Sequence, residues 1–284
     1  MKKLASVLII SLCTLSLSTL ISCDGSSSAS SSGCTLTDNT TETATISTNG
    51  CYKVTRDTSS CLASRTAQGL SGFWLNFSCR VTLTVSGGNV TIVSDIQPDH
   101  TSNYFQSNDP CYSNNQPAGR YQNPNFIAEQ SVSMTVPLVP TPSTSAMPLG
   151  IVGIAVNGVA IYSNAAAPGD NIYDEADSFD YCEGHPDGSS VYHYHIEPPT
   201  ASNNDADFIG VMRDGYPVYG IQEHGGGSPT LDAQGGHTGT TPDSGSATYH
   251  YHTYQQTEGS APFRNAYFIT SGTYAGAIGT CTGC

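Results

Sequence analysis

The stretch that decides the fold is a ten-residue pattern that occurs twice, as GIAVNGVAIY at residues 153–162 and as GVMRDGYPVY at residues 210–219. In each copy, two apolar runs flank an Asn-Gly or Asp-Gly pair. Such pairs favour a type I′ turn, because both of its central residues have positive φ, and the flanking runs are typical of paired strands. The sequence therefore predicts two β-hairpins, the second 57 residues further along the chain.

The repeat continues downstream of each hairpin. The segment FDYCEGH at residues 179–185 corresponds to LDAQGGH at residues 231–237, and the tetrad YHYH at residues 192–195 recurs at residues 249–252. Each unit therefore consists of a hairpin, a loop and a strand, over about residues 153–195 and 210–252. We expect the two units to pack around a pseudo-twofold axis in an all-β fold, as a sandwich or barrel-like domain with disulfides and little helix.

The chain outside the repeat carries weaker signals. Residues 81–85 and 90–92 alternate apolar and polar side chains around Gly87-Gly88, which indicates another hairpin, and residues 132–139 suggest a further strand. Residues 99–130 are polar and are predicted to form loops. We expect a main domain over residues 81–284, preceded by a cysteine-rich segment at residues 34–80.

Composition excludes several functional classes. The 284 residues contain 9 Lys and Arg against 23 Asp and Glu, which gives a net charge of −14. Nucleic-acid binding requires clustered basic side chains, so no nucleic-acid partner is expected. The 29 Gly and 16 Pro, without long helical periodicity, argue against a coiled coil or helical bundle.

The N-terminus has the pattern of a secretory leader. Lys2 and Lys3 precede an apolar run over residues 4–20, which ends in LISC at residues 20–23. These last four residues resemble the bacterial lipobox, in which the cysteine becomes the lipidated first residue of the mature protein. The interpretation is a lipoprotein signal peptide at residues 1–22, lipidation at Cys23 and a serine-rich tether at residues 23–33. The protein would then be exported to the periplasm or cell surface and anchored to the membrane by lipid; the alternative is ordinary cleavage that leaves Cys23 as a spare thiol.

Export would place the remaining cysteines in an oxidising compartment. Eight cysteines follow Cys23, enough for up to four disulfides whose pairing the sequence does not reveal: Cys34, Cys51, Cys61, Cys79, Cys111, Cys182, Cys281 and Cys284. A rival interpretation is a zinc site that joins Cys182-x-x-His185 to Cys281-x-x-Cys284.

The histidines are the candidates for chemistry. Side chains alternate along a strand, so His193 and His195 share one face and Tyr192 and Tyr194 share the other. Histidines two residues apart can aim both imidazoles at one point, and neutral imidazole suits Zn, Cu, Ni and Fe. The sequence predicts a transition-metal site, with Cu or Zn preferred, formed by the tetrad strands and the Gly-His loops: His185, His193, His195, His237, His250 and His252.

The aspartates of the repeat have two possible roles beside such a site. Asp180 and Asp232 could ligate the metal, or each could accept the second N–H of a ligating histidine and so fix its tautomer. Gly184 and Gly236 are expected to let the chain turn sharply before the histidine. The alternative to a metal site is that the histidines are structural and hydrogen-bond backbone carbonyls, while the tyrosines fill the core.

Other patterns are weaker. One segment is crowded with carboxylates that could hold Ca²⁺ or form a solvated acidic loop: Asp170, Asp174, Glu175, Asp177, Asp180, Glu183 and Asp187. Arg213 is expected to pair with this segment or with an anionic ligand, and His224 to lie in a surface loop. Serine-hydrolase, zincin and phosphate-binding motifs are not found in the sequence, so no organic cofactor is expected.

Taken with the hairpins, these motifs resemble the YHYH-domain family of exported bacterial proteins, over about residues 81–280. The pieces that carry the resemblance are the two tetrads, the two Asp-to-Gly-His segments and residues 208–220, joined by residues 96–100, 123–125 and 153–162. The resemblance implies a shared fold and site, adds His100 to the candidate ligands and supplies no substrate. Cys182 has Gln234 opposite it in the second unit, so a thiol role there would not be common to both.

Three functions remain open at this point. The first is a metal-binding lipoprotein for copper or zinc sensing, storage or delivery. The second is a metal-dependent enzyme whose three histidine ligands leave an open position. The third is an adhesion or matrix module with a structural His/Tyr core and a protein or glycan partner. Convergence of the repeat histidines would favour the first two over the third.

Overall fold

The computed structural model describes residues 44–46, 52–54, 57–199, 206–255 and 267–284. The expected leader, the lipidation site at Cys23, the tether, Cys34 and Cys51 lie outside these residues. The described residues belong to one compact unit. None of the helices in the described part of the chain is long and apolar enough to cross a membrane.

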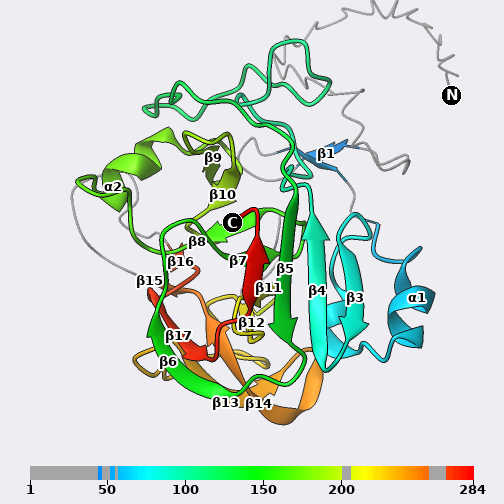
Figure 1. The fold of residues 1–284 in the computed structure, drawn as a ribbon. Coiled ribbons are helices and arrows are strands. Elements are labelled where there is room, and N and C mark those ends of the chain that lie inside the picture. Colours follow the sequence, from blue (N-terminus) through cyan, green and yellow to red (C-terminus); the bar gives the residue numbers. More distant parts are fainter. Residues whose placement is uncertain (1–43, 47–51, 55–56, 200–205, 256–266) are drawn as a thin grey trace, which may run out of the picture. The chain divides into compact units, whose positions relative to one another are not determined.

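The largest sheet contains eight strands in the order β13-β14-β12-β11-β7-β8-β10-β9 (Figure 1). Their bounds, in chain order, are β7 Ile151–Ala155, β8 Ala160–Tyr162, β9 Gly184–Pro186, β10 Tyr192–Tyr194, β11 Phe208–Met212, β12 Pro217–Tyr219, β13 Gly236–Thr241 and β14 Ser244–His252.

This strand order confirms the two predicted units and their pseudo-twofold relation. In each unit a hairpin comes first, and its second strand pairs in parallel with the tetrad strand, β10 or β14. The tetrad strand then pairs antiparallel with the short strand that carries Gly-His, β9 or β13. The two units meet where β7 and β11 pair antiparallel, so one half of the sheet order is the reverse of the other.

Repeat-equivalent glycines allow the two units to approach closely at this centre. Gly210 lies opposite Ala155, and a Cβ added to Gly210 would lie 2.4 Å from the carbonyl oxygen of Ile154. Gly153 lies opposite Met212, and its added Cβ would lie 2.8 Å from the carbonyl oxygen of Val211. Both glycines begin the ten-residue pattern, because a side chain there would push the central strands apart.

The hairpin turns differ from the predicted type I′. Only the glycines have positive φ, 93° at Gly158 and 88° at Gly215, whereas Asn157 and Asp214 do not. Each turn is closed by a hydrogen bond from the glycine N–H to the carbonyl three residues earlier, which fits a type I turn followed by a glycine bulge. A left-handed backbone conformation is therefore not the reason why Asn157 and Asp214 precede these glycines.

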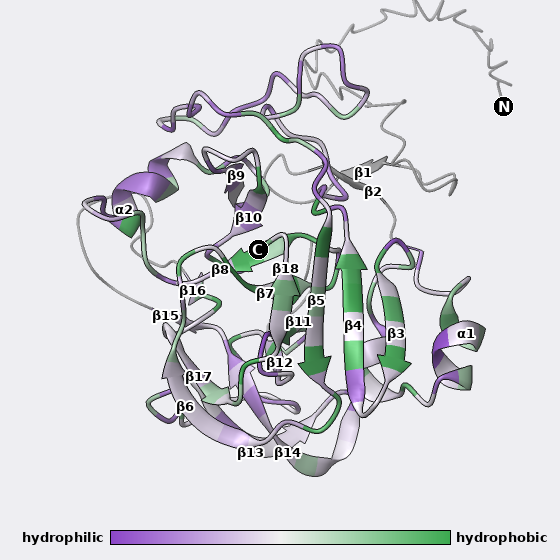
Figure 2. Cartoon of the chain, in the orientation of Figure 1, coloured by the Kyte–Doolittle hydropathy of each residue, from purple (hydrophilic) through white to green (hydrophobic). Residues whose placement is uncertain are grey.

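A second sheet has the strand order β18-β5-β4-β3, with bounds β3 Thr82–Ser86, β4 Asn89–Ser94, β5 Val132–Pro137 and β18 Thr280–Thr282. The predicted hairpin around Gly87-Gly88 and the strand within residues 132–139 are confirmed. Figure 2 shows the hydrophobic residues along β3, β4 and β5. Their inward side chains, such as Ile92 and Met134, share one buried cluster with Ile154 and Val211 of the large sheet, so the two sheets pack together.

The remaining elements are short. Three two-stranded sheets pair β1 Ala44–Ile46 with β2 Tyr52–Val54, β6 Pro142–Ala146 with β17 Thr273–Gly276, and β15 Tyr254–Gln255 with β16 Tyr267–Phe268. The helices are α1 Leu62–Ala67 and α2 Ile172–Glu175, with 3-10 turns at Gly72–Leu75 and Ala176–Ser178. Residues 99–130 form loops, as predicted. The fold is therefore all-β with little helix.

Disulfides form within this fold. Cys61 bonds Cys79 and Cys281 bonds Cys284, and Cys111 and Cys182 are disulfide-bonded as well. Because oxidised sulfurs are not the thiolates that zinc requires, the alternative zinc site of Cys182, His185, Cys281 and Cys284 is wrong.

We expect Gly210→Ala to destabilise the protein by about 1–3 kcal/mol, because the added methyl group overpacks the contact between β7 and β11. Urea unfolding measures the change. Gly245→Ala is the matched control, since a Cβ at that exposed strand position meets no atom within 4 Å. Equal stability of the two variants would contradict the close approach of the central strands.

Candidate metal centres

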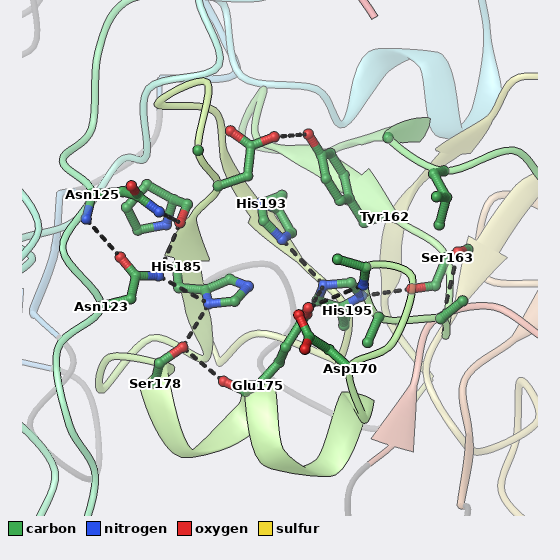
Figure 3. A pocket seen from close by; sticks show the side chains of 18 of the residues that line it. Asn123, Asn125, Tyr162, Ser163, Asp170, Glu175, Ser178, His185, His193 and His195 are labelled. Carbon is green, nitrogen blue, oxygen red and sulfur yellow. Dashed lines mark hydrogen bonds and ion pairs between the residues drawn. The ribbon is translucent and has the colours of Figure 1, made fainter.

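Three histidines of the first unit meet on one face of the sheet. In the register of β9 and β10, His185 lies directly opposite His193, and His195 follows two residues later on the same face. One ring nitrogen from each of the three lies within 4.8 Å of the other two. Figure 3 shows these rings turned toward one another. We call His185, His193 and His195 the first cluster.

The second unit repeats the arrangement. His237 on β13 lies opposite His250 on β14, and His252 shares its face. The Nε2 atom of His237 is 3.1 Å from that of His250 and 3.2 Å from that of His252. A carboxylate joins them, with Glu223 Oε1 3.3 Å from His237 Nε2. These four residues, whose ligand atoms all lie within 4.8 Å of one another, are the second cluster.

The two clusters are separate sites, since β9 and β13 are the two edge strands of the sheet. The Gly-His pairs lie on these edge strands, whereas the sequence analysis placed them in loops. The correction matters because cross-strand pairing, rather than a flexible loop, sets the distance between the third histidine and the tetrad.

Backbone carbonyls orient the tetrad histidines. His193 Nδ1 is 3.0 Å from the carbonyl oxygen of Val191, and His195 Nδ1 is 2.5 Å from that of Ser163. A carbonyl only accepts hydrogen bonds, so each Nδ1 carries the proton and each Nε2 keeps its lone pair. The second cluster repeats both contacts, from His250 Nδ1 to the carbonyl of Thr248 at 3.0 Å and from His252 Nδ1 to that of Gly220 at 2.6 Å.

A side chain assigns the same tautomer to His185. The hydroxyl of Ser178 donates to the carbonyl of Glu175 at 2.7 Å, so it accepts from His185 Nδ1, also at 2.7 Å. The amide nitrogen of Asn123 lies farther from this Nδ1, at 3.4 Å, and donates to the carbonyl of Pro186 at 3.0 Å. The Nε2 atom of His185 is buried and has no hydrogen-bond partner. All three Nε2 lone pairs of the first cluster are therefore available to a cation.

The spacing of these lone pairs fits a metal ion. His193 Nε2 and His195 Nε2 are 3.1 Å apart, yet neither carries a proton to share, so they repel each other unless a cation lies between them. Nitrogen ligands of a tetrahedral ion at 2.0–2.1 Å would be about 3.3 Å apart. The distance between His193 and His195, and those from His237 to His250 and His252, are close to that value. His193 and His195 are each only 2% exposed.

Burial keeps the histidines neutral. It lowers the pKa of His193 to about 4 and, with help from the neighbouring His193, lowers the pKa of His195 to about 3. Burial also lowers the pKa of His250 to about 4, and it lowers the pKa of His185 and His252 below the ordinary value. Neutral imidazole is the form that ligates metals, so the rings are ready for binding at pH 7.

The tetrad tyrosines occupy the opposite face. The hydroxyl of Tyr192 donates to the carboxylate of Asp180, at 3.0 and 2.9 Å from its two oxygens. Asp180 also accepts from the N–H of Cys182 and the hydroxyl of Ser102, so it neither ligates with the histidines nor orients one. A Cβ on Gly184 would lie 2.6 Å from the Tyr192 ring.

The same correction holds in the second unit. Asp232 accepts from the hydroxyl of Tyr249 at 3.2 and 3.0 Å and from the N–H of Gly236 at 3.0 Å. Gly236 has ordinary φ, and its Cβ would meet the hydroxyl of Tyr249 at 2.5 Å. The proposed aspartate roles and the proposed sharp turns are therefore wrong: Asp and Gly together make room for the tyrosine and hold it.

His100 also lies on the tyrosine side. It is fully buried, with Nε2 3.0 Å from the hydroxyl of Tyr194 and Nδ1 3.0 Å from the carbonyl of Thr101. The amide of Asn157 donates to the same hydroxyl at 3.2 Å. His100 therefore belongs to a hydrogen-bond network beneath the tetrad, and the structure does not bring it to either cluster.

Sequence reasoning missed both carboxylates near the clusters. Glu223 belongs to the second cluster, and Glu175 Oε2 lies 3.6 Å from His195 Nε2. Glu175 and Glu223 lie in the two connections between a hairpin and a Gly-His strand. These connections differ in length, so the repeat does not align the two glutamates. The only signal was the position of Glu175 in the acidic segment.

The carboxylates of that acidic segment do not converge on a cation site among the described residues. The groups of converging ligand atoms found there are the two histidine clusters. Glu183 pairs with Arg120, at 3.0 Å, rather than with Arg213. Arg213 instead donates to the carbonyl of Gly279 at 3.4 Å, so its expected pairing is wrong. His224 lies exposed in a loop, as predicted.

A pocket of about 420 Å³ opens on the first cluster (Figure 3). All three histidines line it, together with Tyr162, Asp170 and Glu175. The ring of Tyr162 stacks on His193 at a centroid distance of 3.7 Å and hydrogen-bonds Asp187 through its hydroxyl at 2.8 Å. One wall of the site is therefore a fixed aromatic ring.

The lowered histidine pKa values predict the pH dependence of the metal-free protein. An unfolded histidine titrates near pH 6.5, so between about pH 6.5 and pH 4 the unfolded state binds a proton that folded His193 does not. Stability is therefore lost as the pH falls through this window, by up to about 1.4 kcal/mol per pH unit for each such histidine.

Urea unfolding with a chelator present, at several pH values, measures this slope. We expect the double variant His193→Gln, His195→Gln to have a shallower slope and the surface variant His224→Gln to keep that of the parent. Identical slopes for all three proteins would contradict the neutral, buried state of the first cluster.

One of three comparisons with known proteins found a match. Searches of curated proteins and of solved structures found no match. A family model described as "YHYH protein" matches residues 133–225, which include the first cluster, the first tetrad and the second hairpin. The chain therefore carries a YHYH segment at residues 133–225, as the resemblance predicted.

Proposed function

We propose that this protein is an exported, lipid-anchored metal-binding protein that holds one Cu or Zn ion in each of its two histidine clusters. The observation that carries the proposal is the convergence of one ring nitrogen from each of three histidines, while the Nδ1 atom of each contacts an acceptor of the protein. This pattern, in which the second ring nitrogen fixes tautomer and orientation, is that of metal-ligating histidine.

The structural alternative accounts less well for the same contacts. A histidine kept only for hydrogen bonding would use both nitrogens, because an unsatisfied buried acceptor costs about 1–3 kcal/mol. His185 Nε2 has no such partner, and His193 and His195 present two acceptors to each other. An adhesion module would need neither arrangement.

The donor set favours borderline transition metals over hard cations. Each cluster offers three imidazoles, and the second adds one carboxylate. Ca²⁺ and Mg²⁺ prefer six or more oxygen donors, whereas Zn and Cu accept three nitrogens with one further ligand. Copper or zinc handling outside the cytoplasm would suit the proposed location.

Export is supported by the leader pattern and by the disulfides. Cys61–Cys79 and Cys281–Cys284 are bonds of a kind that persist in oxidising compartments. Cys23 within LISC would carry the lipid, so the membrane is the proposed partner through that anchor.

Elemental analysis of the untagged full-length protein tests metal binding. We expect about two metal ions per chain after loading and dialysis, because each cluster supplies a complete set of histidines. His193→Gln with His195→Gln should lose one ion, and His250→Gln with His252→Gln should lose the other.

The exposed loop variant His224→Ala is the control and should retain both ions. A metal-free wild-type protein that also fails to take up added Zn²⁺ or Cu²⁺ would refute the proposal. Equal metal content in all variants would show that the ions bind elsewhere.

Membrane fractionation tests the lipid anchor. We expect Cys23→Ala to move the protein from the membrane fraction to the soluble fraction and to abolish labelling by a radioactive fatty acid, because the acyl acceptor is gone. Cys13→Ala, within the leader, should leave both unchanged. Continued labelling of the Cys23 variant would contradict lipidation at this residue.

A further inference from the structure

We infer that the two clusters have different tasks: the second is a closed structural metal site, whereas the first keeps an open coordination position at which water and a neutral small molecule can bind. This inference rests on the proposed function, since it assigns the two metal sites to different chemistry. The inference is based on the two connections ahead of β9 and β13, which differ between the units and place Glu175 and Glu223 differently.

The second cluster supplies a complete tetrahedral set. Glu223 and the three histidines place one ligand atom each within 4.8 Å of all the others, and Glu223 Oε1 is 3.3 Å from His237 Nε2. That distance is what two ligands of one ion would show. Four protein ligands leave no position for an exchangeable donor, as in structural zinc sites.

The first cluster supplies only three mutually close ligands. Glu175 does not join the converging group, although its Oε2 lies 3.6 Å from His195 Nε2. Its other oxygen accepts the N–H of Ala167 at 3.1 Å, which ties the carboxylate to the loop ahead of α2. The short helix α2 thus holds Glu175 beside the cluster rather than within it (Figure 3).

The fourth position of the first cluster faces a space that a ligand can enter. The pocket of about 420 Å³ is lined by all three histidines and by Glu175, and the buried His185 Nε2 has no hydrogen-bond partner among the described residues. Three protein ligands with an open position are typical of metal sites that bind and activate water. Glu175 lies where it can accept a hydrogen bond from such a donor.

Charge limits what else can enter. The pocket lining contains the carboxylates of Asp170, Glu175 and Asp187 and neither Lys nor Arg. Phosphorylated or sulfated molecules would lack a cationic partner other than the metal, and carboxylates would repel them. The amides of Asn123 and Asn125 lie at the same wall, so a neutral molecule with hydrogen-bonding groups is the class that fits.

Cobalt(II) loading of the full-length protein tests this division, because its visible absorption reports coordination and imidazole, which is largely neutral at about pH 8, is a small probe for an open position. We expect two cobalt ions per chain, with imidazole changing the spectrum of one. The imidazole response should survive in His250→Gln with His252→Gln and be lost in His193→Gln with His195→Gln.

The two glutamates provide a matched pair of variants. Glu223→Ala should open the second cluster and so double the imidazole response, whereas Glu175→Ala should leave one cobalt ion responsive because Glu175 is not a ligand. An imidazole response from the second cluster of the parent protein, or none from a cobalt-loaded first cluster, would overturn the inference while leaving metal binding intact. Failure of either cluster to take up cobalt would instead overturn the proposed function together with the inference.

Discussion

The alternation of side chains along the tetrad strand is the constraint on which both sites depend. A strand places successive side chains on opposite faces, so the order Tyr-His-Tyr-His sends two phenols one way and two imidazoles the other. Tyr192 and Tyr249 are each held by a carboxylate, from Asp180 and Asp232. A shift of the strand register by one residue would move the histidines to the tyrosine face and the tyrosines to the histidine face. The hydrogen bonds between tyrosine and aspartate oppose that shift.

The pseudo-twofold sheet explains why two clusters share one geometry, and the loops explain why they differ. Each tetrad strand lies between the second hairpin strand and an edge strand. The residue directly after the hairpin strand, Ser163 or Gly220, supplies the carbonyl acceptor of the second tetrad histidine, and the edge strand supplies the third histidine. The connections ahead of the edge strands are free to vary, since they carry no ladder hydrogen bonds. One became α2 with Glu175, and the other became a glycine-rich segment that presents Glu223.

Much of this architecture could be predicted from sequence because the signals were periodic. The repeat predicted the hairpins and the pseudo-twofold relation, and alternation placed the two histidines of each tetrad on one face. The roles of Asp180, Gly184 and His100 could not be predicted, because they depend on packing across the opposite face of the sheet. Glu223 was missed because the connection that carries it differs in length from the corresponding connection of the first unit. The predicted turn type was wrong because the prediction assigned Asp214 a backbone role, whereas its side chain accepts a hydrogen bond from the hydroxyl of Tyr251.

The preorganised clusters have an energetic consequence for folding. The fold buries His185, His193 and His195 with one ring nitrogen of each close to the other two, and the hydrogen bonds of their Nδ1 atoms prevent the rings from turning away. This arrangement destabilises the metal-free fold, since mutually repelling acceptors lose water without gaining a donor. A bound cation would replace each repulsion between lone pairs with metal–ligand bonds. Because the metal would bind only the folded clusters, tighter metal binding would stabilise the edges of the sheet by a corresponding free energy. The edge strands β9 and β13, which have a partner on one side only, are where that coupling acts most directly.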